Sequence, residues 1–323
     1  MGFVPEEALA PKTHTKPYIV VDDFLPLELA QSMRADIDAH FGTPDKHRPE
    51  AHQIWNYWYV PNTYTYLRTQ PEKVIEHGKV DAFLTALRDW SIAQLGMSDV
   101  TWPYLSLYIP GCNQALHNDA LNGRLAFVYS LTRDQRLTIG GETIVMSEGD
   151  PFRSNLASPQ AVQGFCTFIE PKFNRLVLFD DRMIHAVQRL EGSMDPVEGR
   201  FVFHGHIKEQ GPIVTGAQSY EALQPFLQQG LGTFVQEYGD YAFNFHGPIS
   251  VRFVVGADGI VGNMHVLLDR VTHVAERDAA GWEDLRRRYL LALGGIRYAA
   301  AEAPTVVILP IVFAGPAGRQ PQT

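Results

Sequence analysis

The feature that most constrains the fold is a run of short apolar segments between residues 101 and 208, each ended by Gly, Pro, Asn or Asp. Segments of four to nine residues that are rich in β-branched and aromatic side chains are typical of strands in a sandwich or barrel. We therefore predict an all-β core here. Its candidate strands are Tyr104 to Ile109, Leu125 to Leu131, Glu142 to Met146, Arg175 to Phe179 and Arg200 to Ile207.

The residues before this core show helical spacing instead. Leu29, Met33, Ile37 and Phe41 recur at every fourth position, which predicts a helix that ends at Gly42. A second helix is predicted within residues 71 to 95, where an apolar stripe recurs. Helices followed by strands indicate an α+β class, with a double-stranded β-helix (jelly roll) core braced by N-terminal helices.

After about residue 210 the pattern changes again. Residues 219 to 237 are expected to be helical, and Gly256-Ala257-Asp258-Gly259 is a hairpin turn between two strands, 250 to 255 and 260 to 268. A helix over 282 to 293 and a strand over 306 to 313 complete a small α+β unit. We expect a jelly-roll domain over 1–210, an accessory domain over 211–314 and a disordered tail over 315–323.

Composition excludes several classes of protein. The chain of 323 residues has 27 Lys and Arg against 36 Asp and Glu, a net charge of −9, so nucleic acid and anionic membranes are not expected partners. No basic, apolar leader opens the sequence, and no apolar run reaches the roughly 18 residues of a membrane helix. We expect a cytoplasmic protein in which the two cysteines are free thiols.

The residues that are most informative about function are His117-Asn118-Asp119 and the distant His185. Side chains two positions apart on a strand share a face, so His117 and Asp119 can point into one cavity. His185 would then complete a set of two histidines and one carboxylate, which leaves positions open on Fe(II) for a chelating cosubstrate and O₂. The motif alone is weak, because the chain has 12 histidines.

The surrounding residues make the motif specific. It lies within Tyr108-Ile109-Pro110-Gly111, Arg124 to Leu131, Gly140-Gly141-Glu142, Ile169 to Phe179, His185-Ala186-Val187-Gln188 and Arg200. From about residue 18 to 208 this string resembles the 2-oxoglutarate- and Fe(II)-dependent dioxygenases of the prolyl-4-hydroxylase class. The resemblance implies Fe(II) at the triad, 2-oxoglutarate and O₂ as cosubstrates, and ascorbate as a possible aid.

The resemblance also implies cosubstrate contacts. Arg200 would pair bidentately with the remote carboxylate of 2-oxoglutarate, and Tyr108 would add a hydroxyl donor. Ser130 stands where the family has a second cosubstrate tyrosine, while Tyr129 would face the other way. Arg189 is a rival for the carboxylate because of its even spacing from His185, and residues 191 to 199 form an insertion.

Two further histidines offer an alternative ligand set. His204 and His206 alternate on one strand, and His206 stands where the family has a tryptophan. No carboxylate or third histidine lies at ligand spacing from them, so we interpret them as lining the barrel.

The resemblance implies hydroxylation of an unactivated C–H bond, on a free amino acid or a peptide, with succinate and CO₂ as co-products; desaturation and cyclisation stay open. The retained Asp119 disfavours halogenation. Candidate mouth segments are 55 to 66, 120 to 123 and 149 to 164. The aromatic residues within the first of these, Trp55 to Tyr59, Tyr64 and Tyr66, are interpreted as core packing.

Residues 249 to 261 and 304 to 310 resemble the C-terminal domain of TonB-type and AgmX-type bacterial proteins. That resemblance implies strand pairing with a protein partner or a second copy, and a purely structural appendage is an equal alternative. Two other functions are weighed: a cupin-like metal protein that is not an oxygenase, and a degenerate barrel that acts as a scaffold through the C-terminal domain.

Overall fold

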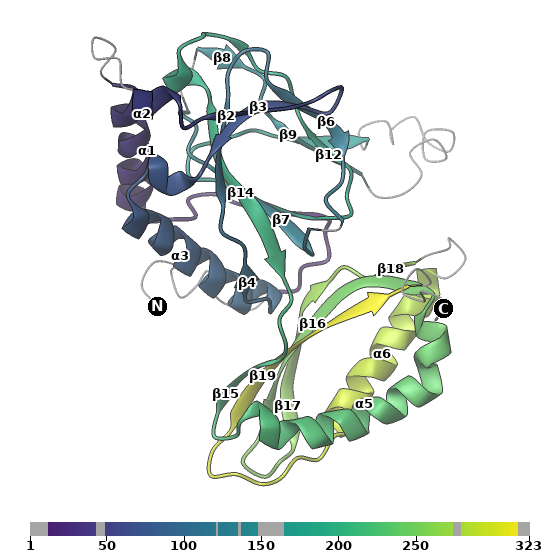
Figure 1. The fold of residues 1–323 in the computed structure, drawn as a ribbon. Helices are drawn as coiled ribbons and strands as arrows, with labels where there is room; N and C mark the ends of the chain where they lie inside the picture. Colours follow the sequence, from purple (N-terminus) through teal and green to yellow (C-terminus); the bar gives the residue numbers. More distant parts are fainter. Residues whose placement is uncertain are drawn as a thin grey trace, which may run out of the picture. The chain divides into compact units, whose positions relative to one another are not determined.

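The structure is a computed structural model that describes residues 12–42, 49–120, 122–134, 137–147, 165–273 and 279–315. Within this part the chain forms two compact units (Figure 1). The first contains Lys16–Asp89 and Asp99–Lys208, and the second contains 12–15, Trp90–Ser98 and the residues from 209 onward. The segment 90–98 thus clusters with the second unit, which the sequence pattern did not indicate.

The predicted N-terminal helices of the first unit are confirmed. Helix α1 (Leu27–Phe41) buries Met33 and Ile37, and α3 (His77–Leu95) buries Val80 and Phe83. The spacing of four in the first helix and the apolar stripe in the second are the patterns that place these side chains on one helical face. The smaller elements around them are β1 (Tyr18–Val21), α2 (Pro49–His52) and the 3-10 turn η2 (Pro71–Lys73).

The jelly-roll prediction is also confirmed. In the described residues, eight strands pair as two antiparallel rows of four, β11-β7-β14-β5 and β6-β12-β9-β10. This is the pairing that two packed Greek keys produce. Their bounds are β5 (Tyr104–Tyr108), β6 (Asn113–His117), β7 (Leu125–Ser130), β9 (Thr143–Met146), β10 (Cys166–Ile169), β11 (Leu176–Asp180), β12 (His185–Val187) and β14 (Arg200–Lys208).

A hairpin of β2 (Asn56–Val60) and β3 (Tyr64–Thr69) connects the two rows, because β3 pairs with both β5 and β6. Strand β2 pairs only with β3 among the described strands, so it is an edge strand. Tyr57 and Tyr59 are 62% and 58% exposed on it. The interpretation of these aromatic residues as core packing is therefore wrong for β2, in which every residue is exposed.

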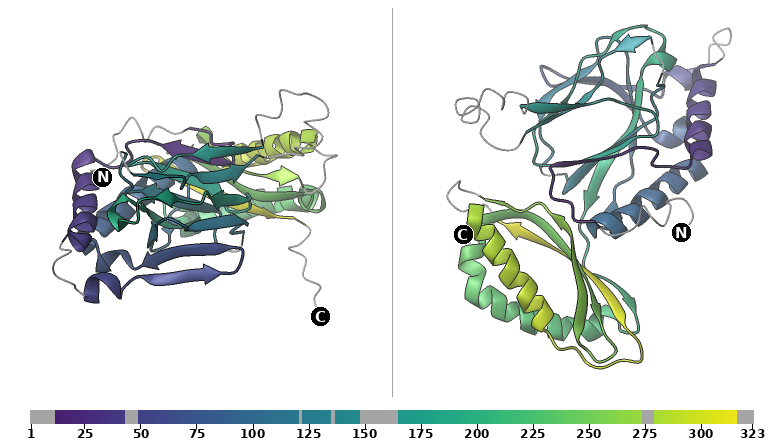
Figure 2. Two further views of the ribbon diagram at one scale, coloured as in Figure 1. Left: turned by 90° about the horizontal axis from the view of Figure 1, so that it is seen from above. Right: turned by 180° about the vertical axis from the view of Figure 1, so that it is seen from behind.

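Alternation along β14 separates two environments. Phe201 and Phe203 are buried against Phe41 of α1 and Phe83 of α3 respectively. The intervening even-numbered side chains of β14 face the interior of the barrel. Figure 2 shows from behind that both helices lie along the same side of this barrel.

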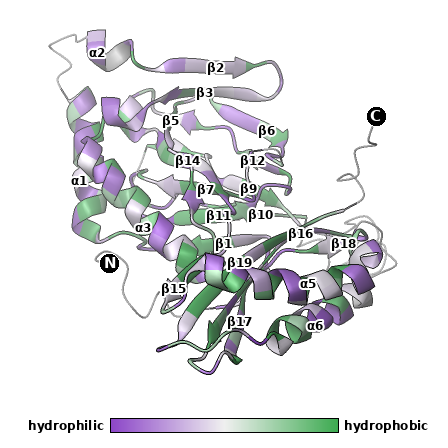
Figure 3. Ribbon diagram, turned by 60° about the horizontal axis from the view of Figure 1, so that its bottom comes forward, coloured by the Kyte–Doolittle hydropathy of each residue, from purple (hydrophilic) through white to green (hydrophobic). Residues whose placement is uncertain are grey.

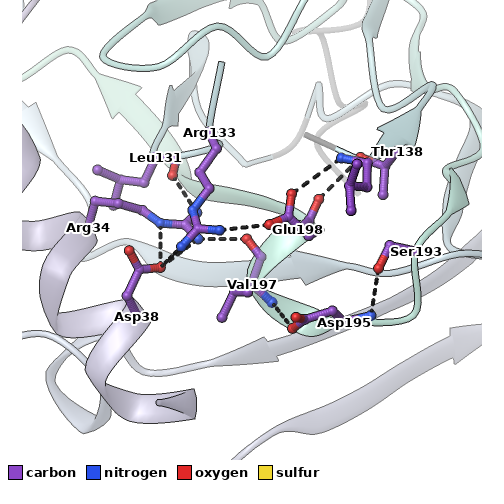
Figure 4. A network of polar contacts seen from close by, with 10 residues as sticks. Arg34, Asp38, Leu131, Arg133, Thr138, Ser193, Asp195, Val197 and Glu198 are labelled. Carbon is purple, nitrogen blue, oxygen red and sulfur yellow. Dashed lines mark hydrogen bonds and ion pairs between the residues drawn. The ribbon is translucent and has the colours of Figure 1, made fainter. Parts of the chain in front are cut away.

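The insertion before β14 is tied to α1 by a polar network (Figure 4). Arg34 donates hydrogen bonds to the Asp38 carboxylate and to the carbonyl oxygens of Leu131 and Val197, at 2.9 and 2.6 Å respectively. Arg133 pairs with Glu198 at 2.7 Å. The insertion itself contains β13 (Glu191–Gly192) and the 3-10 turn η4 (Pro196–Glu198), and β13 pairs with β8 (Thr138–Ile139). At the far end of β14, β4 (Asp99–Val100) adds a short pairing outside the insertion.

The second unit is the predicted α+β arrangement. Its antiparallel sheet has the order β15-β19-β16-β17, with β18 paired to β16, and α5 and α6 pack on it. In Figure 3 the strands are largely hydrophobic, whereas both helices mix polar and apolar residues. The bounds are β15 (Ile213–Gly216), α5 (Tyr220–Ala242), β16 (Phe245–Val255), β17 (Val261–Asp269), β18 (Thr272–His273), α6 (Ala279–Gly295) and β19 (Thr305–Ala314).

Three smaller expectations have different outcomes. Cys112 and Cys166 are free, as predicted. None of the helices in the described ranges combines the length and apolarity that crossing a membrane requires. The expected tail beyond Gly315 and the mouth segment 149 to 164 lie outside the described residues.

Candidate metal centre

The three predicted ligands come together because of one strand pairing. His117 is the last residue of β6 and His185 is the first residue of β12, and the two lie directly opposite each other. Asp119 follows two residues after His117, where its backbone N–H donates to the Asp181 carbonyl at 2.9 Å. Ligand atoms of all three side chains lie within 4.8 Å of one another.

Each imidazole is oriented by its own backbone. Nδ1 of His117 lies 2.7 Å from the carbonyl oxygen of Ala115, and Nδ1 of His185 lies 3.1 Å from that of Met183. A carbonyl accepts only, so each Nδ1 carries its proton and each Nε2 is free to bind a metal. The Nε2 of His185 lies 3.4 Å from Oδ2 of Asp119. This donor set fits Fe(II) on one face and leaves its remaining positions open.

The protonation states also suit a metal. Burial, aided by the nearby His185, lowers the pKa of His117, so its ring is neutral at physiological pH. Burial by itself raises the pKa of Asp119, but the close contact with His185 and the nearby His117 and His206 outweigh it and bring the pKa below its usual value. A neutral imidazole and an ionised carboxylate are the forms that bind metal ions.

The triad opens into a cavity of about 490 Å³ inside the first unit. Arg200 lines it and is only 1% exposed. Its NH2 group donates to Oγ1 of Thr143 at 3.1 Å, and its guanidinium carbon lies 4.7 Å from the ring centroid of Tyr108. Tyr108 stacks in turn on Tyr66, with centroids 5.2 Å apart, and burial raises its pKa. A charged guanidinium therefore shares the cavity with the metal ligands.

The other predicted positions lie elsewhere. Ser130 is not among the described residues that line the cavity, because its hydroxyl donates to the Pro171 carbonyl at 3.0 Å. Tyr129 faces the helices and donates to Asn174, as its place in β7 predicted. Arg189 is 63% exposed and pairs with Glu191. The structure thus brings Arg200 and Tyr108 to the triad and leaves Ser130 and Arg189 away from it.

The two further histidines line the cavity without joining the metal set. His206 lies 3.2 Å from Oδ2 of Asp181, and His204 stacks on Tyr104 with centroids 5.8 Å apart. Burial lowers the pKa of His204 to about 3. Their interpretation as barrel-lining residues agrees with these positions.

Sequence reasoning missed several residues of this wall. Thr143, which holds Arg200, and Gln114 of β6 were not singled out, and neither was Arg68. Alternation along β3 was the available signal: Tyr64, Tyr66 and Arg68 occupy one face, and all three line the cavity.

Comparison with known proteins gives distant similarities. No family model and no curated protein matches the chain. A Pseudomonas putida prolyl-4-hydroxylase superposes with a TM-score of 0.44 and 18% identity, over 61% of this chain and 94% of that one. A Trichoplax adhaerens prolyl hydroxylase in complex with a peptide of the hypoxia inducible factor gives 0.43 and 13%, over 59% and 82%. SnoN, a non-heme alpha ketoglutarate dependent epimerase from nogalamycin biosynthesis, gives 0.42 and 12%, over 60% and 78%.

These likenesses are too distant to carry a functional conclusion, so the fold and the site rest on the strand pairing and side chains of this chain itself. The TonB-type resemblance of the second unit finds no support in any of the comparisons. What the structure confirms there is the α+β arrangement of a hairpin, two helices and a closing strand.

Proposed function

We propose that the protein is a 2-oxoglutarate- and Fe(II)-dependent oxygenase that hydroxylates an unactivated C–H bond of a small molecule or peptide, with succinate and CO₂ as co-products. One observation carries the proposal. The triad of His117, Asp119 and His185 shares a cavity with the buried Arg200. Nδ1 of each histidine is bound to a backbone carbonyl, which leaves each Nε2 for the metal. A metal site and a fixed cation in one cavity suit a cosubstrate that chelates iron and carries a second carboxylate.

Bound Fe(II) would supply the redox chemistry that activates O₂. The residues of this chain have simpler tasks. The triad holds the metal on one face, Thr143 fixes the direction of the Arg200 guanidinium, and the ring of Tyr108 covers it. Arg200 then binds the distal carboxylate of 2-oxoglutarate through its N–H donors, which keeps the cosubstrate in one orientation.

The proposal is tested by anaerobic titration of the purified protein with Fe(II) and 2-oxoglutarate. Formation of the chelate gives a weak visible absorption band, and admission of O₂ with ascorbate then yields succinate. His185→Ala should abolish both signals, while His77→Ala, at an exposed histidine of α3, should leave both unchanged. If iron-loaded protein shows neither the band nor succinate, the oxygenase proposal is wrong and the triad belongs to a metal protein of another kind.

A further inference from the structure

A second arginine lines the cavity in addition to Arg200. Arg68 lies on β3, on the same face as Tyr64 and Tyr66, and its guanidinium contacts two aromatic rings. Its central carbon lies 3.6 Å from the ring centroid of Trp58 and 4.5 Å from that of Tyr104. Two cation–π contacts hold the side chain in place at the cavity wall.

The fold does not neutralise this cation. Across the described ranges no carboxylate forms an ion pair with Arg68, whereas Arg34, Arg133 and Arg175, elsewhere in the first unit, all have acidic partners. Lys208, another cation of the wall, stands opposite Asp99 in the pairing of β14 with β4. Arg68 is therefore the better candidate for a ligand anion.

The charges of the proposed iron site sharpen this point. Fe(II), the Asp119 carboxylate, the 2-oxoglutarate dianion and Arg200 cancel one another. Among the described lining residues this leaves Arg68 as a positive excess, with Lys208 opposite Asp99, in a chain with a net charge of −9. A concave site that concentrates one sign of charge attracts ligands of the opposite sign.

One polar atom on the same wall also needs a partner. Nε2 of His204 is buried and has no hydrogen-bond partner in the described structure, and its ring lies between Tyr104 and Tyr66. Because His204 is neutral at physiological pH, it can donate to or accept from a ligand without repelling either charge. A buried group of this kind costs free energy until a ligand satisfies it.

We propose that the substrate oxidised at this site carries a carboxylate that pairs with Arg68, while its apolar body lies against the aromatic wall of Trp58, Tyr104 and Tyr66. The proposal rests on the oxygenase function and names the substrate class for it. A guanidinium matches a carboxylate through two parallel N–H···O hydrogen bonds, which gives orientation as well as affinity. The carboxylate end would be fixed at Arg68, and the apolar part would extend toward the triad.

Two probes that differ in charge test the proposal: 3-phenylpropionate and the neutral 3-phenylpropan-1-ol. Each is titrated into the full-length protein under anaerobic conditions with Fe(II) and 2-oxoglutarate present, so that Arg200 is occupied. Trp58 and Trp102 line the cavity and report binding by fluorescence. We expect the acid to bind at least about tenfold more tightly than the alcohol, as a charge-assisted pair provides.

Arg68→Gln should reduce this preference to about threefold or less, whereas Arg88→Gln, at an exposed arginine of α3, should retain it. Equal binding of acid and alcohol to the wild-type protein would overturn the proposal. So would a preference that survives Arg68→Gln and disappears in Arg200→Lys. The Fe(II)/2-oxoglutarate band of the same wild-type sample distinguishes the oxygenase proposal from the carboxylate-site proposal. Absence of the band counts against the oxygenase. A band without a preference for the acid over the alcohol counts against the carboxylate site.

Discussion

His185 lies directly opposite His117 in the pairing of β12 with β6, and their ring centroids are 4.2 Å apart. The two residues are 68 positions apart in sequence, so the ligand set exists only when these strands pair. The same backbone that forms the pair also supplies the carbonyl groups that orient both rings. The ligand set therefore forms as a direct consequence of the pairing of β6 with β12.

Asp119→Ala should weaken Fe(II) binding at least about 100-fold, because Asp119 supplies the anionic ligand of the triad and even outer partners of metal ligands contribute 10- to 100-fold. Anaerobic equilibrium dialysis measures the affinity directly. Asp81→Ala, at an exposed carboxylate of α3, is the matched control and should bind iron as the wild type does. Unchanged affinity in Asp119→Ala would refute the ligand assignment.

Arg200→Lys should reduce the affinity for 2-oxoglutarate at least about tenfold, because a lysine cannot form the two parallel hydrogen bonds of a guanidinium. The positive charge is retained, which limits the damage to folding at this buried position. The concentration of 2-oxoglutarate needed to develop the visible band reports the change. Arg189→Ala serves as the control, and a comparable loss there would transfer the role to the exposed arginine.

Protonation of His204 on unfolding should lower the free energy of unfolding of the first unit in acid. Burial and the nearby His206 and Arg68 lower its pKa to about 3, so below pH 6.5 the unfolded chain takes up a proton that the folded chain refuses. The free energy of unfolding thus falls as the pH drops from 6.5 toward 3, by at most about 1.4 kcal/mol per pH unit.

Urea denaturation of the wild type and of His204→Gln at pH 6.5 and pH 5 measures this effect. The glutamine variant should lose less free energy of unfolding than the wild type over that interval, since it removes the titrating group. His77→Gln, at an exposed histidine, should follow the wild type. Equal losses of the free energy of unfolding in all three proteins would show that the pKa of His204 does not differ between the folded and unfolded states.

Arg34→Leu should destabilise the protein by about 3 kcal/mol. The change leaves the carbonyl groups of Leu131 and Val197 without their donor and Asp38 without its close ion pair. Urea unfolding at pH 7 measures the loss, and Arg88→Leu should stay within about 0.5 kcal/mol of the wild type. A loss below about 1 kcal/mol would mean that the network in Figure 4 contributes little to stability.

Local sequence patterns predicted most of the elements correctly. The spacing of four in α1 and the short apolar runs that became β5, β7, β9, β11 and β14 each have a periodicity that one segment displays by itself. Strands were assumed at His117 and at His185, but the bounds of β6 and β12 were not predicted, although these strands hold two of the three ligands. They are short and partly polar, and their neighbours in the barrel define them.

The aromatic hairpin shows a second limit. Tyr57 and Tyr59 are of residue types common in cores, but they are exposed on β2, which is an edge strand at the end of the hairpin with β3. Whether a strand lies at an edge depends on the order of strands in the sheet, and that order does not appear in the strand itself.

The sequence by itself determined which residues can bind the metal, because the HxD motif and the later histidine are a specific set of ligand types in a fixed order. Only the tertiary structure decided which cations line the cavity of the triad. Arg189 follows the end of β12, so the alternation that aligned it with His185 stops before it, and it turns to Glu191 at the surface. Arg200 and Arg68 lie within strands whose inner faces close the barrel. Alternation assigns side chains to two faces, but only the packing of the barrel and its helices decides which face encloses the site.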